Sequence, residues 1–212
     1  MKPFAIITET DARLLDIGST VELAVGGVVT PLARDTLAAR RVTVVPAGTL
    51  DPSIPPDLAP VADVRRVTIG SDHSGVALKR TILHHLRGRG LAVLDVGTDG
   101  PEAVDYPDIA AAVAKSVARH EADAGIVIDG AGIGSAIAAN KVRGVRAAMC
   151  LDETTARYSR EHNGANVLSL GASLLPSSEA AIRIVEVWLG TAMREARYIR
   201  RLAKIRWLEE QR

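Results

Sequence analysis

GIVIDGAGIGS, residues 125–135, is the stretch that decides the fold. Its apolar first part, Gly125–Ile128, is typical of a strand that is buried on both faces of a parallel sheet. Asp129 ends this strand, glycines alternate with other residues after it, and a helix is expected to begin near Ile133. A buried strand that passes through a glycine turn into a helix is the repeating unit of an α/β protein.

The same order of strand, loop and helix continues on both sides of this stretch. The expected strands are Val67–Gly70, Leu91–Val96, Gly125–Ile128, Val145–Cys150 and Asn166–Leu170. The expected helices are Val76–Arg87, Ile109–Arg119, Ile133–Lys141, Glu153–Glu161, Ser178–Leu189 and a charged helix from about Thr191. Such alternation forms right-handed βαβ units. It predicts a doubly wound parallel sheet, a Rossmann-like three-layer αβα domain, which binds ligands at the carboxyl ends of its strands.

The first part of the chain has a different organisation. Its expected elements are strands at Ile6–Ile7, Val21–Val25 and Val42–Val45 and a helix from Thr30 to about Arg40. The proline-rich residues 46–63 follow, and because proline fixes φ and lacks an N–H group, they are expected to form an extended linker. We therefore expect a small α/β appendage with its linker, residues 1–63, before the main domain, residues 64–212. A docking or dimer-stabilising role suits such an appendage.

The composition argues against several classes of protein. Lys and Arg total 26 and Asp and Glu total 25, and the net charge of +1 offers little attraction for a polyanion. Aromatic residues make up 3% of the chain, which leaves few surfaces for stacking bases. The single cysteine, Cys150, cannot form an intramolecular disulfide or a cysteine-based metal site. With no long apolar run and no signal-peptide pattern, the sequence indicates a cytoplasmic protein that binds neither nucleic acid nor a membrane.

Asp72 and His73 follow the first strand of the main domain, between Gly70 and Gly75. At a strand end this pair can hydrogen-bond a polyhydroxylated ligand. Alternatively, Ser71 or Asp72 caps the next helix and His73 faces solvent. The residues by themselves leave both interpretations open.

The glycine turn after Asp129 offers backbone N–H groups at the start of a helix. They can hold a phosphate or a developing enediolate oxygen. The residues that carry these groups are Gly130, Ala131, Gly132, Gly134 and Ser135. Tight turning alone also explains the glycines. A dinucleotide site is a third interpretation, because Asp152 lies about 20 residues further on, although the spacing here is G-x-G-x-G.

Two basic features lie later in the chain. His162 and Asn163 end the helix Glu153–Glu161, where the helix dipole favours a protonated histidine, although a cap by Asn163 is an alternative. Arg197 and Arg201 share one face of the last helix. Guanidinium groups suit phosphate recognition, but a solvated charged face explains them as well.

Together these motifs resemble the family of ribose-5-phosphate isomerase B and the galactose-6-phosphate isomerase subunits, over residues 66–205. The matching motifs are Gly70–Gly75, Leu78-Lys79, Asp105–Asp108, the glycine turn into Ala138–Lys141, Gly144–Ala148, His162-Asn163, Ala165–Leu168, Gly171 and Trp188-Leu189. The resemblance implies an enzyme that interconverts aldose and ketose phosphates through an enediolate, without a metal or another cofactor. Residues 1–63 are an extension that is atypical of the family.

The resemblance also implies roles for single residues. Asp72 and His73 would hold the sugar, Tyr106 would line the pocket, and the amides of residues 130–135 would stabilise the enediolate.

The remaining implied roles belong to the second half of the domain. His162 would open the sugar ring, and Asn163 would bind a hydroxyl group. Arg197 and Arg201 would bind the phosphate in the site of a neighbouring subunit. A homodimer, or a homotetramer with shared sites, is therefore expected.

The chain departs from the family at the position of the base. Asp129 stands where one branch has a cysteine base, and Ser135 stands where another branch has glutamate. Ala131 replaces a frequent threonine, and Ala172 and Ser173 stand where an arginine is usual. Asp129 is therefore the expected base, with a pKa raised by partial burial. The sequence predicts an isomerase of a tetrose to hexose phosphate or, alternatively, a non-catalytic subunit that binds sugar phosphate.

Overall fold

The computed structural model describes residues 3–47, 58–193 and 196–211. The chain divides into two compact units, Met1–Pro55 with Arg194–Arg197, and Pro56–Met193 with Tyr198–Arg212. Residues 48–57, most of the predicted linker, lie outside the described part. Within the described part, no helix is both long and apolar enough to cross a membrane.

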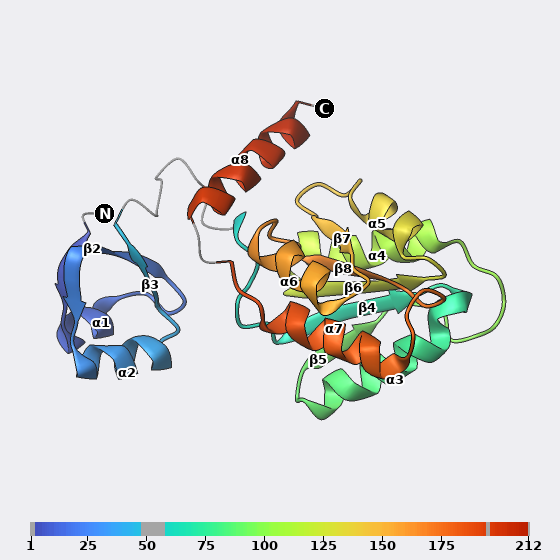
Figure 1. The fold of residues 1–212 in the computed structure, drawn as a ribbon, viewed down its shortest axis with the longest axis horizontal. Coiled ribbons are helices and arrows are strands. Elements are labelled where there is room, and N and C mark those ends of the chain that lie inside the picture. Colours follow the sequence, from blue (N-terminus) through green and yellow to red (C-terminus); the bar gives the residue numbers. More distant parts are fainter. Residues whose placement is uncertain (1–2, 48–57, 194–195, 212) are drawn as a thin grey trace. The chain divides into compact units, whose positions relative to one another are not determined.

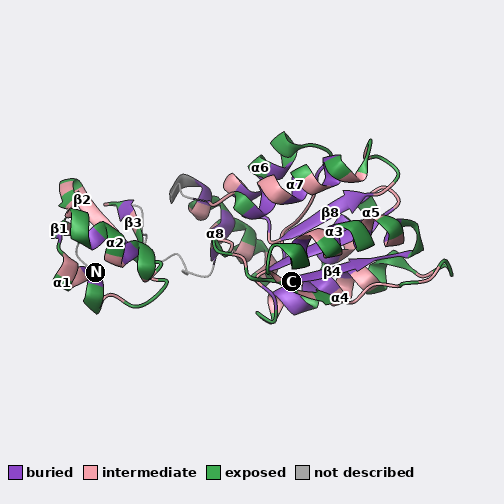
Figure 2. Ribbon diagram, turned by 90° about the horizontal axis from the view of Figure 1, so that it is seen from below, coloured by how far each residue is buried: buried purple, intermediate pink, exposed green. Residues whose placement is uncertain are grey.

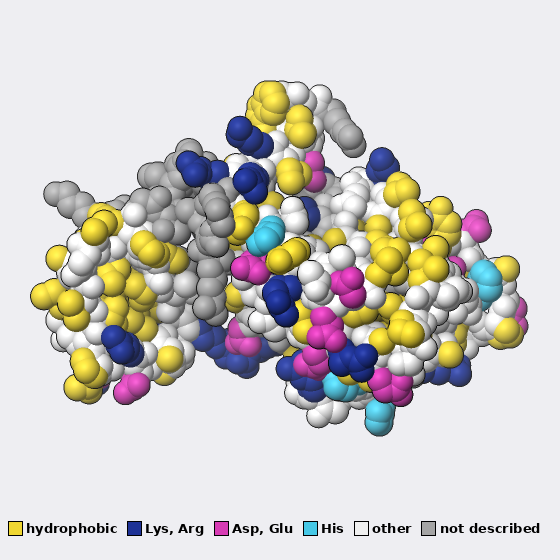
Figure 3. All heavy atoms as spheres, viewed as in Figure 1, with side chains coloured by type: hydrophobic (Ala, Val, Ile, Leu, Met, Phe, Trp, Pro, Cys, Tyr) yellow, Lys and Arg dark blue, Asp and Glu magenta, His cyan; other side chains and the backbone are white. Residues whose placement is uncertain are grey.

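The first unit is a three-stranded parallel sheet with two helices. Its elements are β1 (Phe4–Ile7), α1 (Glu9–Leu14), β2 (Thr20–Val29), α2 (Pro31–Ala39) and β3 (Thr43–Pro46), with the strands in the order β1-β2-β3. Thr8 and Thr30 cap the two helices through their side-chain oxygens. Figure 3 shows hydrophobic side chains on the surface of this unit. The exposed ones include Ile6, Leu14, Ile17, Val25, Val28 and Leu32.

β2 is longer than the sequence predicts. The prediction ends the strand at Val25, but β2 continues through Gly26 and Gly27 to Val29. Gly26 has a φ of +76°, and the register against β1 shifts between Phe4 and Ile6. A left-handed glycine at a register shift is typical of a β-bulge, which lets a strand continue past residues that otherwise end it.

The second unit is a five-stranded parallel sheet with helices on both faces (Figure 1). Its strands are β4 (Arg66–Ser71), β5 (Ala92–Asp95), β6 (Ala124–Asp129), β7 (Ala147–Met149) and β8 (Val167–Gly171), in the order β5-β4-β6-β8-β7. Its helices are the short η2 (His73–Gly75), α3 (Val76–Gly88), α4 (Tyr106–Ala118), α5 (Ile133–Ala139), α6 (Glu153–Glu161), α7 (Ser178–Gly190) and, from Tyr198 onward, α8 (Ala196–Glu210). The predicted αβα architecture is confirmed.

A hydrophobic core lies on each face of this sheet. Helices α3, α6 and α7 cover one face, where Ile82, Ile184 and Trp188 are buried. Helices α4 and α5 cover the other face with smaller side chains such as Val113 and Ala139. All residues of β6 and β8 are buried between these layers (Figure 2). Cover on both faces explains why these strands are apolar throughout instead of alternating.

Some element ends differ from the prediction. The strand expected at Val145–Cys150 is shorter, because the backbone N–H of Arg146 donates to Asn166 Oδ1 at 2.7 Å and the ladder with β8 begins only at Ala147. Helix α4 begins at Tyr106, earlier than expected, with Pro107 in its first turn.

The order of the strands places a topological switch point at the carboxyl edge of the sheet. From β4 the chain passes to β5 on one side and then to β6 on the other side. In open α/β sheets, ligands bind at such a switch point, outside the carboxyl ends of the strands. Ser71 ends β4 and Asp129 ends β6, so the residues that follow them lie at this switch point.

Candidate active site

The carboxylate of Asp129 occupies the amide cradle of the glycine turn. Its Oδ1 accepts hydrogen bonds from the backbone N–H groups of Ala131, at 2.8 Å, and of Gly132. Its Oδ2 accepts the N–H of Ser135 at 2.9 Å. The side chain is 5% exposed. The turn therefore holds an anion, one of the interpretations that the sequence leaves open, and in this structure the anion is the chain's own carboxylate.

The pKa of Asp129 lies below its ordinary value. Burial raises the pKa, but the neighbouring Ser135 side chain and the amides of Gly132, Ser135 and Ala131 stabilise the ionised form more strongly. The prediction that burial would give Asp129 a raised pKa is therefore wrong. The sequence shows that the residue is buried, but not that three amides point at it.

The ends of β6 and β8 fit together so closely that side chains are excluded. Gly132 has a φ of +76°, and a Cβ there would lie 2.8 Å from the backbone of Gly171. A Cβ on Gly171 would lie 2.6 Å from the backbone of Ala131. Ser169 Oγ also donates to the carbonyl of Gly132 at 2.6 Å. These contacts hold the turn in the conformation that presents its amides.

Tyr106 and the turn after β4 also meet the glycine turn. The ring of Tyr106 would lie 2.6 Å from a Cβ on Gly134, so only glycine fits under the ring. A Cβ on Gly130 would lie 3.6 Å from Ser74 Oγ. The structure thus brings the predicted residues that follow β4 and β6 together with Tyr106.

Asp72 acts as a helix cap, the alternative that the sequence left open. Its Oδ1 accepts hydrogen bonds from Ser74 N, Ser74 Oγ and Gly75 N at 2.9, 2.6 and 3.2 Å. His73 is exposed, and its Nδ1 accepts the N–H of Val104 at 3.4 Å. The neutral ring therefore carries its proton on Nε2, where it can donate to a ligand.

Lys79 supports these residues from behind, and sequence analysis assigned it no role. Its side chain is completely buried, and its Nζ donates to Asp95 Oδ1 at 2.9 Å, to Asp99 Oδ1 at 3.1 Å and to the carbonyl of Thr98 at 2.8 Å. A Cβ on Gly97, in the same loop, would lie 2.3 Å from Ser71 N. Lys79 therefore holds the loop that packs against the end of β4. The signal in the sequence is a lysine on an apolar helix face.

His162 and Asn163 do not lie with Asp129 and the glycine turn. The His162 ring is stacked on Tyr158, with centroids 4.6 Å apart, and contacts Tyr198 of α8 at 4.5 Å. The guanidinium group of Arg201 lies over the ring of the same Tyr198, 5.5 Å from the ring centroid. Asn163 Nδ2 donates to the carbonyl of Tyr158 at 3.0 Å, which is the helix-capping alternative of the sequence analysis. The side chain of Arg197 lies outside the described part of the structure.

One chain does not bring the two sets of predicted residues together. Asp129 pairs with Gly171 at the carboxyl ends of β6 and β8, whereas His162 precedes Val167, the first residue of β8. At about 3.3 Å per residue, the length of β8 separates the two edges by roughly 13 Å. We call Asp72, His73, Tyr106 and residues 129–135 the carboxyl-edge group, and His162, Asn163 and Arg201 the amino-edge group.

The structure gives no support to a dinucleotide site. Asp152, the expected ribose ligand, caps α6 by accepting the N–H of Thr155 at 2.7 Å. In the described part of the chain, no three His, Cys, Asp or Glu side chains gather in a way that could hold a metal ion.

Comparison with known proteins relates the second unit to sugar isomerases. A family model described as Ribose/Galactose Isomerase matches residues 67–205. Ribose-5-phosphate isomerase B of Escherichia coli is 42% identical over 149 residues, which are 70% of this chain and 99% of the relative. A putative sugar phosphate isomerase of Bacillus subtilis is 40% identical over 146 residues, 68% of this chain and 97% of the relative.

Solved structures show the same relationship to sugar phosphate isomerases. Ribose-5-phosphate isomerase B of Clostridium thermocellum superposes with a TM-score of 0.67 at 47% identity, covering 69% of this chain and 98% of that one. The enzyme of Mycoplasma genitalium, solved with bound ribulose-5-phosphate, gives a TM-score of 0.67 at 39% identity, covering 69% and 97%. Residues 1–66 precede the family match. From residue 67 to residue 205, this chain belongs to the ribose/galactose isomerase family.

Proposed function

We propose that this isomerase acts on ribose 5-phosphate or on a related tetrose to hexose phosphate, with Asp129 as the base that moves the proton. The observation that carries the proposal is the Asp129 carboxylate, held by three amides beside Tyr106 at the switch point of the sheet. The Mycoplasma genitalium relative holds ribulose-5-phosphate in its solved structure, which supports a pentose phosphate as the first substrate to test. A cytoplasmic location belongs to the same proposal.

The cradle links binding to catalysis. An aldose and a ketose interconvert when a base removes the proton from the carbon next to the carbonyl and returns it to the former carbonyl carbon. The enediolate between these steps needs N–H donors, and Asp129 now occupies them. When the substrate oxygen takes over these amides, the Asp129 carboxylate loses the interactions that lower its pKa and becomes the stronger base. Asp72, His73 and Tyr106 hold the sugar in this scheme.

A second copy of the chain completes the site. His162, Asn163 and Arg201 lie at the opposite edge of the sheet from Asp129, so we infer that the partner's amino-edge group reaches the carboxyl-edge group across a two-fold interface. Arg197 joins the amino-edge group in this proposal. In this arrangement His162 opens the ring, Asn163 binds a hydroxyl group and the arginines bind the phosphate.

Mixed dimers test this sharing. Asp129→Asn and His162→Ala chains are each expected to be nearly inactive, but refolding them together creates dimers in which one site has both changes and the other has neither. Random mixing restores about a quarter of the wild-type activity in a two-fold dimer. The matched control mixes Asp129→Asn with His73→Ala, which lie in one group and cannot complement. Equal activity of the two mixtures would show that each chain builds its own site.

A screen for isomerisation tests the function itself. Tetrose, pentose and hexose phosphates are incubated with the full chain in deuterated water, and proton exchange at C1 and C2 is followed by NMR. We expect exchange and turnover with at least one pentose phosphate.

A second candidate function is a subunit that binds sugar phosphate without converting it. The lowered pKa of Asp129 favours it, because a weakly basic carboxylate removes a carbon-bound proton poorly. Tight binding without any exchange of solvent deuterium would establish this function, and measured turnover would exclude it.

Gly134 provides a test of the substrate pocket. Gly134→Ala places a methyl group against the Tyr106 ring and is expected to displace that ring and raise KM by about tenfold, with a smaller effect on kcat. Gly88→Ala is the matched control, because a Cβ at Gly88 meets no atom within 4 Å. If Gly134→Ala and Gly88→Ala changed KM equally, Tyr106 would not be part of the substrate pocket.

A further inference from the structure

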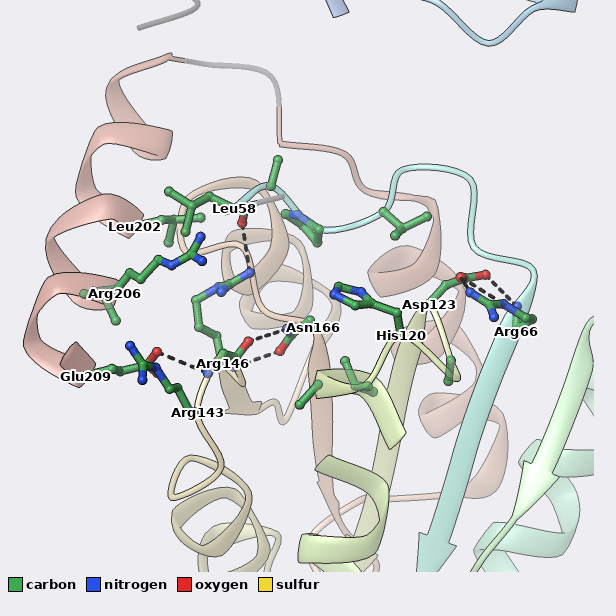
Figure 4. A pocket seen from close by; sticks show the side chains of 18 residues that line it. Leu58, Arg66, His120, Asp123, Arg143, Arg146, Asn166, Leu202, Arg206 and Glu209 are labelled. Carbon is green, nitrogen blue, oxygen red and sulfur yellow. Dashed lines mark hydrogen bonds and ion pairs between the residues drawn. The ribbon is translucent and has the colours of Figure 1, made fainter. Parts of the chain in front are cut away.

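Residues 58–61 form one wall of a cavity of about 360 Å³ at the amino edge of the sheet (Figure 4). They belong to the second unit, but they precede the family match, which begins at residue 67. The sequence predicts an extended linker here, and a linker needs no contact with the domain that it precedes. Leu58 is nevertheless only 3% exposed. The end of the linker is therefore packed into the isomerase unit.

Two arginines connect this segment to the turn that follows α6. The first is Arg146, in the loop before β7. Its Nη2 donates to the carbonyl of Leu58 at 2.9 Å, which Figure 4 shows as a dashed line, and its Nε donates to the carbonyl of Gly164 at 2.8 Å. One guanidinium group thus joins the linker to the residue that directly follows His162 and Asn163.

The second connection is made by Arg160, two positions before His162. Its Nη1 donates to the carbonyl of Ala165 at 2.9 Å, and its Nη2 donates to the carbonyl of Val61 at 2.8 Å. Arg160 therefore repeats the arrangement of the first arginine, with one carbonyl from the linker and one from the turn. The linker and the turn are joined at two places by groups that each hold both.

The carbonyl of Val61 is important to Arg160 because this side chain is completely buried. Its guanidinium group lies 4.7 Å from the centroid of the Trp188 ring, and its Nε has no hydrogen-bond partner among the described residues. Burial, and then the nearby charge of Arg146, lower the pKa of Arg160 to about 10. A buried cation that lost a carbonyl would shift toward another acceptor or toward water. Ala165, bound to the same group, is expected to shift with it.

The turn of residues 162–165 is packed so closely that such a shift reaches its side chains. Gly164 has a φ of +57°, and a Cβ there would lie 2.6 Å from Leu202 Cδ1 and 3.4 Å from Arg146 Nε. The N–H of Gly164 donates to the carbonyl of Arg160 at 3.0 Å. Because the turn contacts both arginines, a displacement of either one is expected to move His162.

We propose that residues 58–61 are a positioning segment of the isomerase site, which holds the turn of residues 162–165 and with it His162 and Asn163. This inference rests on the proposed function, in which His162 opens the sugar ring in the partner's site. The segment contacts no substrate in this scheme, because it acts through Arg146 and Arg160. The end of the linker then has a part in the reaction besides joining the two units of the chain.

Hydrogen exchange of the full chain, followed by mass spectrometry, tests the segment without an assay of activity. Leu58→Asp places a charge at a buried position and is expected to release the segment. We expect the N–H groups of residues 162–165 to exchange about tenfold faster in this variant, while those of residues 130–135 keep their rate. Ala62→Asp, the same charge at an exposed neighbouring position, is the matched control. Leu58→Met keeps the volume of the side chain and is expected to keep the slow exchange.

A kinetic test separates ring opening from proton transfer. Ribulose 5-phosphate cannot close a furanose ring, because its C5 hydroxyl carries the phosphate. Exchange of its C1 protons with deuterated water therefore needs the base but no ring opening, whereas turnover of cyclic ribose 5-phosphate needs both. We expect Leu58→Asp to lower this turnover about fivefold and to change the C1 exchange less than about twofold. His162→Ala is expected to show the same split between turnover and exchange.

The outcomes distinguish this inference from the proposed function. Unchanged amide exchange of residues 162–165 in Leu58→Asp would overturn the inference, and so would equal losses of turnover and C1 exchange, which a general loss of structure produces. If the wild-type chain converts no sugar phosphate, the proposed function fails, and the amide exchange alone still decides whether the segment holds the turn. Thermal unfolding verifies that Leu58→Asp folds, and Leu58→Ala takes its place if it does not.

Discussion

Asp129→Asn is expected to lower kcat on the order of 10³-fold, the effect of removing a general base. Asparagine keeps the shape of the side chain but cannot accept a proton from carbon. KM is expected to change much less, because the groups that hold the sugar stay in place. The measurement is the initial rate with the sugar phosphate found in the screen, followed by coupled assay or NMR.

The same substitution is expected to destabilise the fold by about 1–3 kcal/mol, because the amide group has one oxygen where the carboxylate offers two. Three backbone N–H groups, two of them buried, compete for that oxygen. Asp152→Asn is the matched control: Asp152 also caps a helix, but it is exposed and asparagine is an equally good cap. Undiminished turnover in Asp129→Asn would eliminate this residue as the base.

The stability effect depends on pH in a defined direction. Burial raises the pKa of Asp129, but the Ser135 side chain and the three amides lower it further, so its pKa in the folded chain lies below its ordinary value. A carboxylate with a lowered pKa stabilises the fold above its unfolded pKa, and this stability is lost as the pH falls through the folded value. The difference in unfolding free energy between wild type and Asp129→Asn should therefore be constant above pH 5 and shrink below about pH 4. Urea titrations at several pH values measure it.

The architecture of the second unit could be predicted because strand and helix periods, turn glycines and burial all agree along the chain. The apolar run before Asp129 is an example, since its place in the middle of a sheet follows from its pattern alone. The separation of His162 from Asp129 was also predictable in principle. A helix that precedes a parallel strand ends at the amino edge of the sheet, so His162 could never share an edge with Asp129 in one chain.

Other features depend on the orientation of backbone groups and on the pairing of strands, which the sequence pattern does not reveal. Whether burial or hydrogen bonding decides the pKa of Asp129 depends on where three N–H groups point. The bulge at Gly26 arises from the pairing of β2 with β1, which the residues before Gly26 do not specify. Lys79 acts through Asp95, Thr98 and Asp99, residues that only the packing of β5 beside β4 brings to it.

Lys79→Met is expected to lower the free energy of unfolding by about 3 kcal/mol, the lower part of the range for breaking a buried ion pair from one side. The substitution leaves Asp95, which is 22% exposed, and the carbonyl of Thr98 without their cation. Asp99 is 76% exposed and can return to water, which keeps the loss from being larger. Urea unfolding followed by circular dichroism measures the effect. Lys115→Met, at an exposed position of α4, is the matched control and is expected to change stability by less than about 0.5 kcal/mol.

Adding Asp95→Asn separates the charge from the packing. If the unpaired carboxylate of Asp95 causes the loss, the double substitution Lys79→Met with Asp95→Asn should recover part of the stability, because it leaves no uncompensated charge at that position. The loop from Asp95 to Asp99 packs against Ser71, the residue before Asp72 and His73. Lys79→Met is therefore also expected to raise KM more than it lowers kcat. The opposite outcome is that Asp95→Asn makes the loss of stability larger and that Lys79→Met leaves KM unchanged. Lys79 would then be a packing residue that does not position Asp72 and His73.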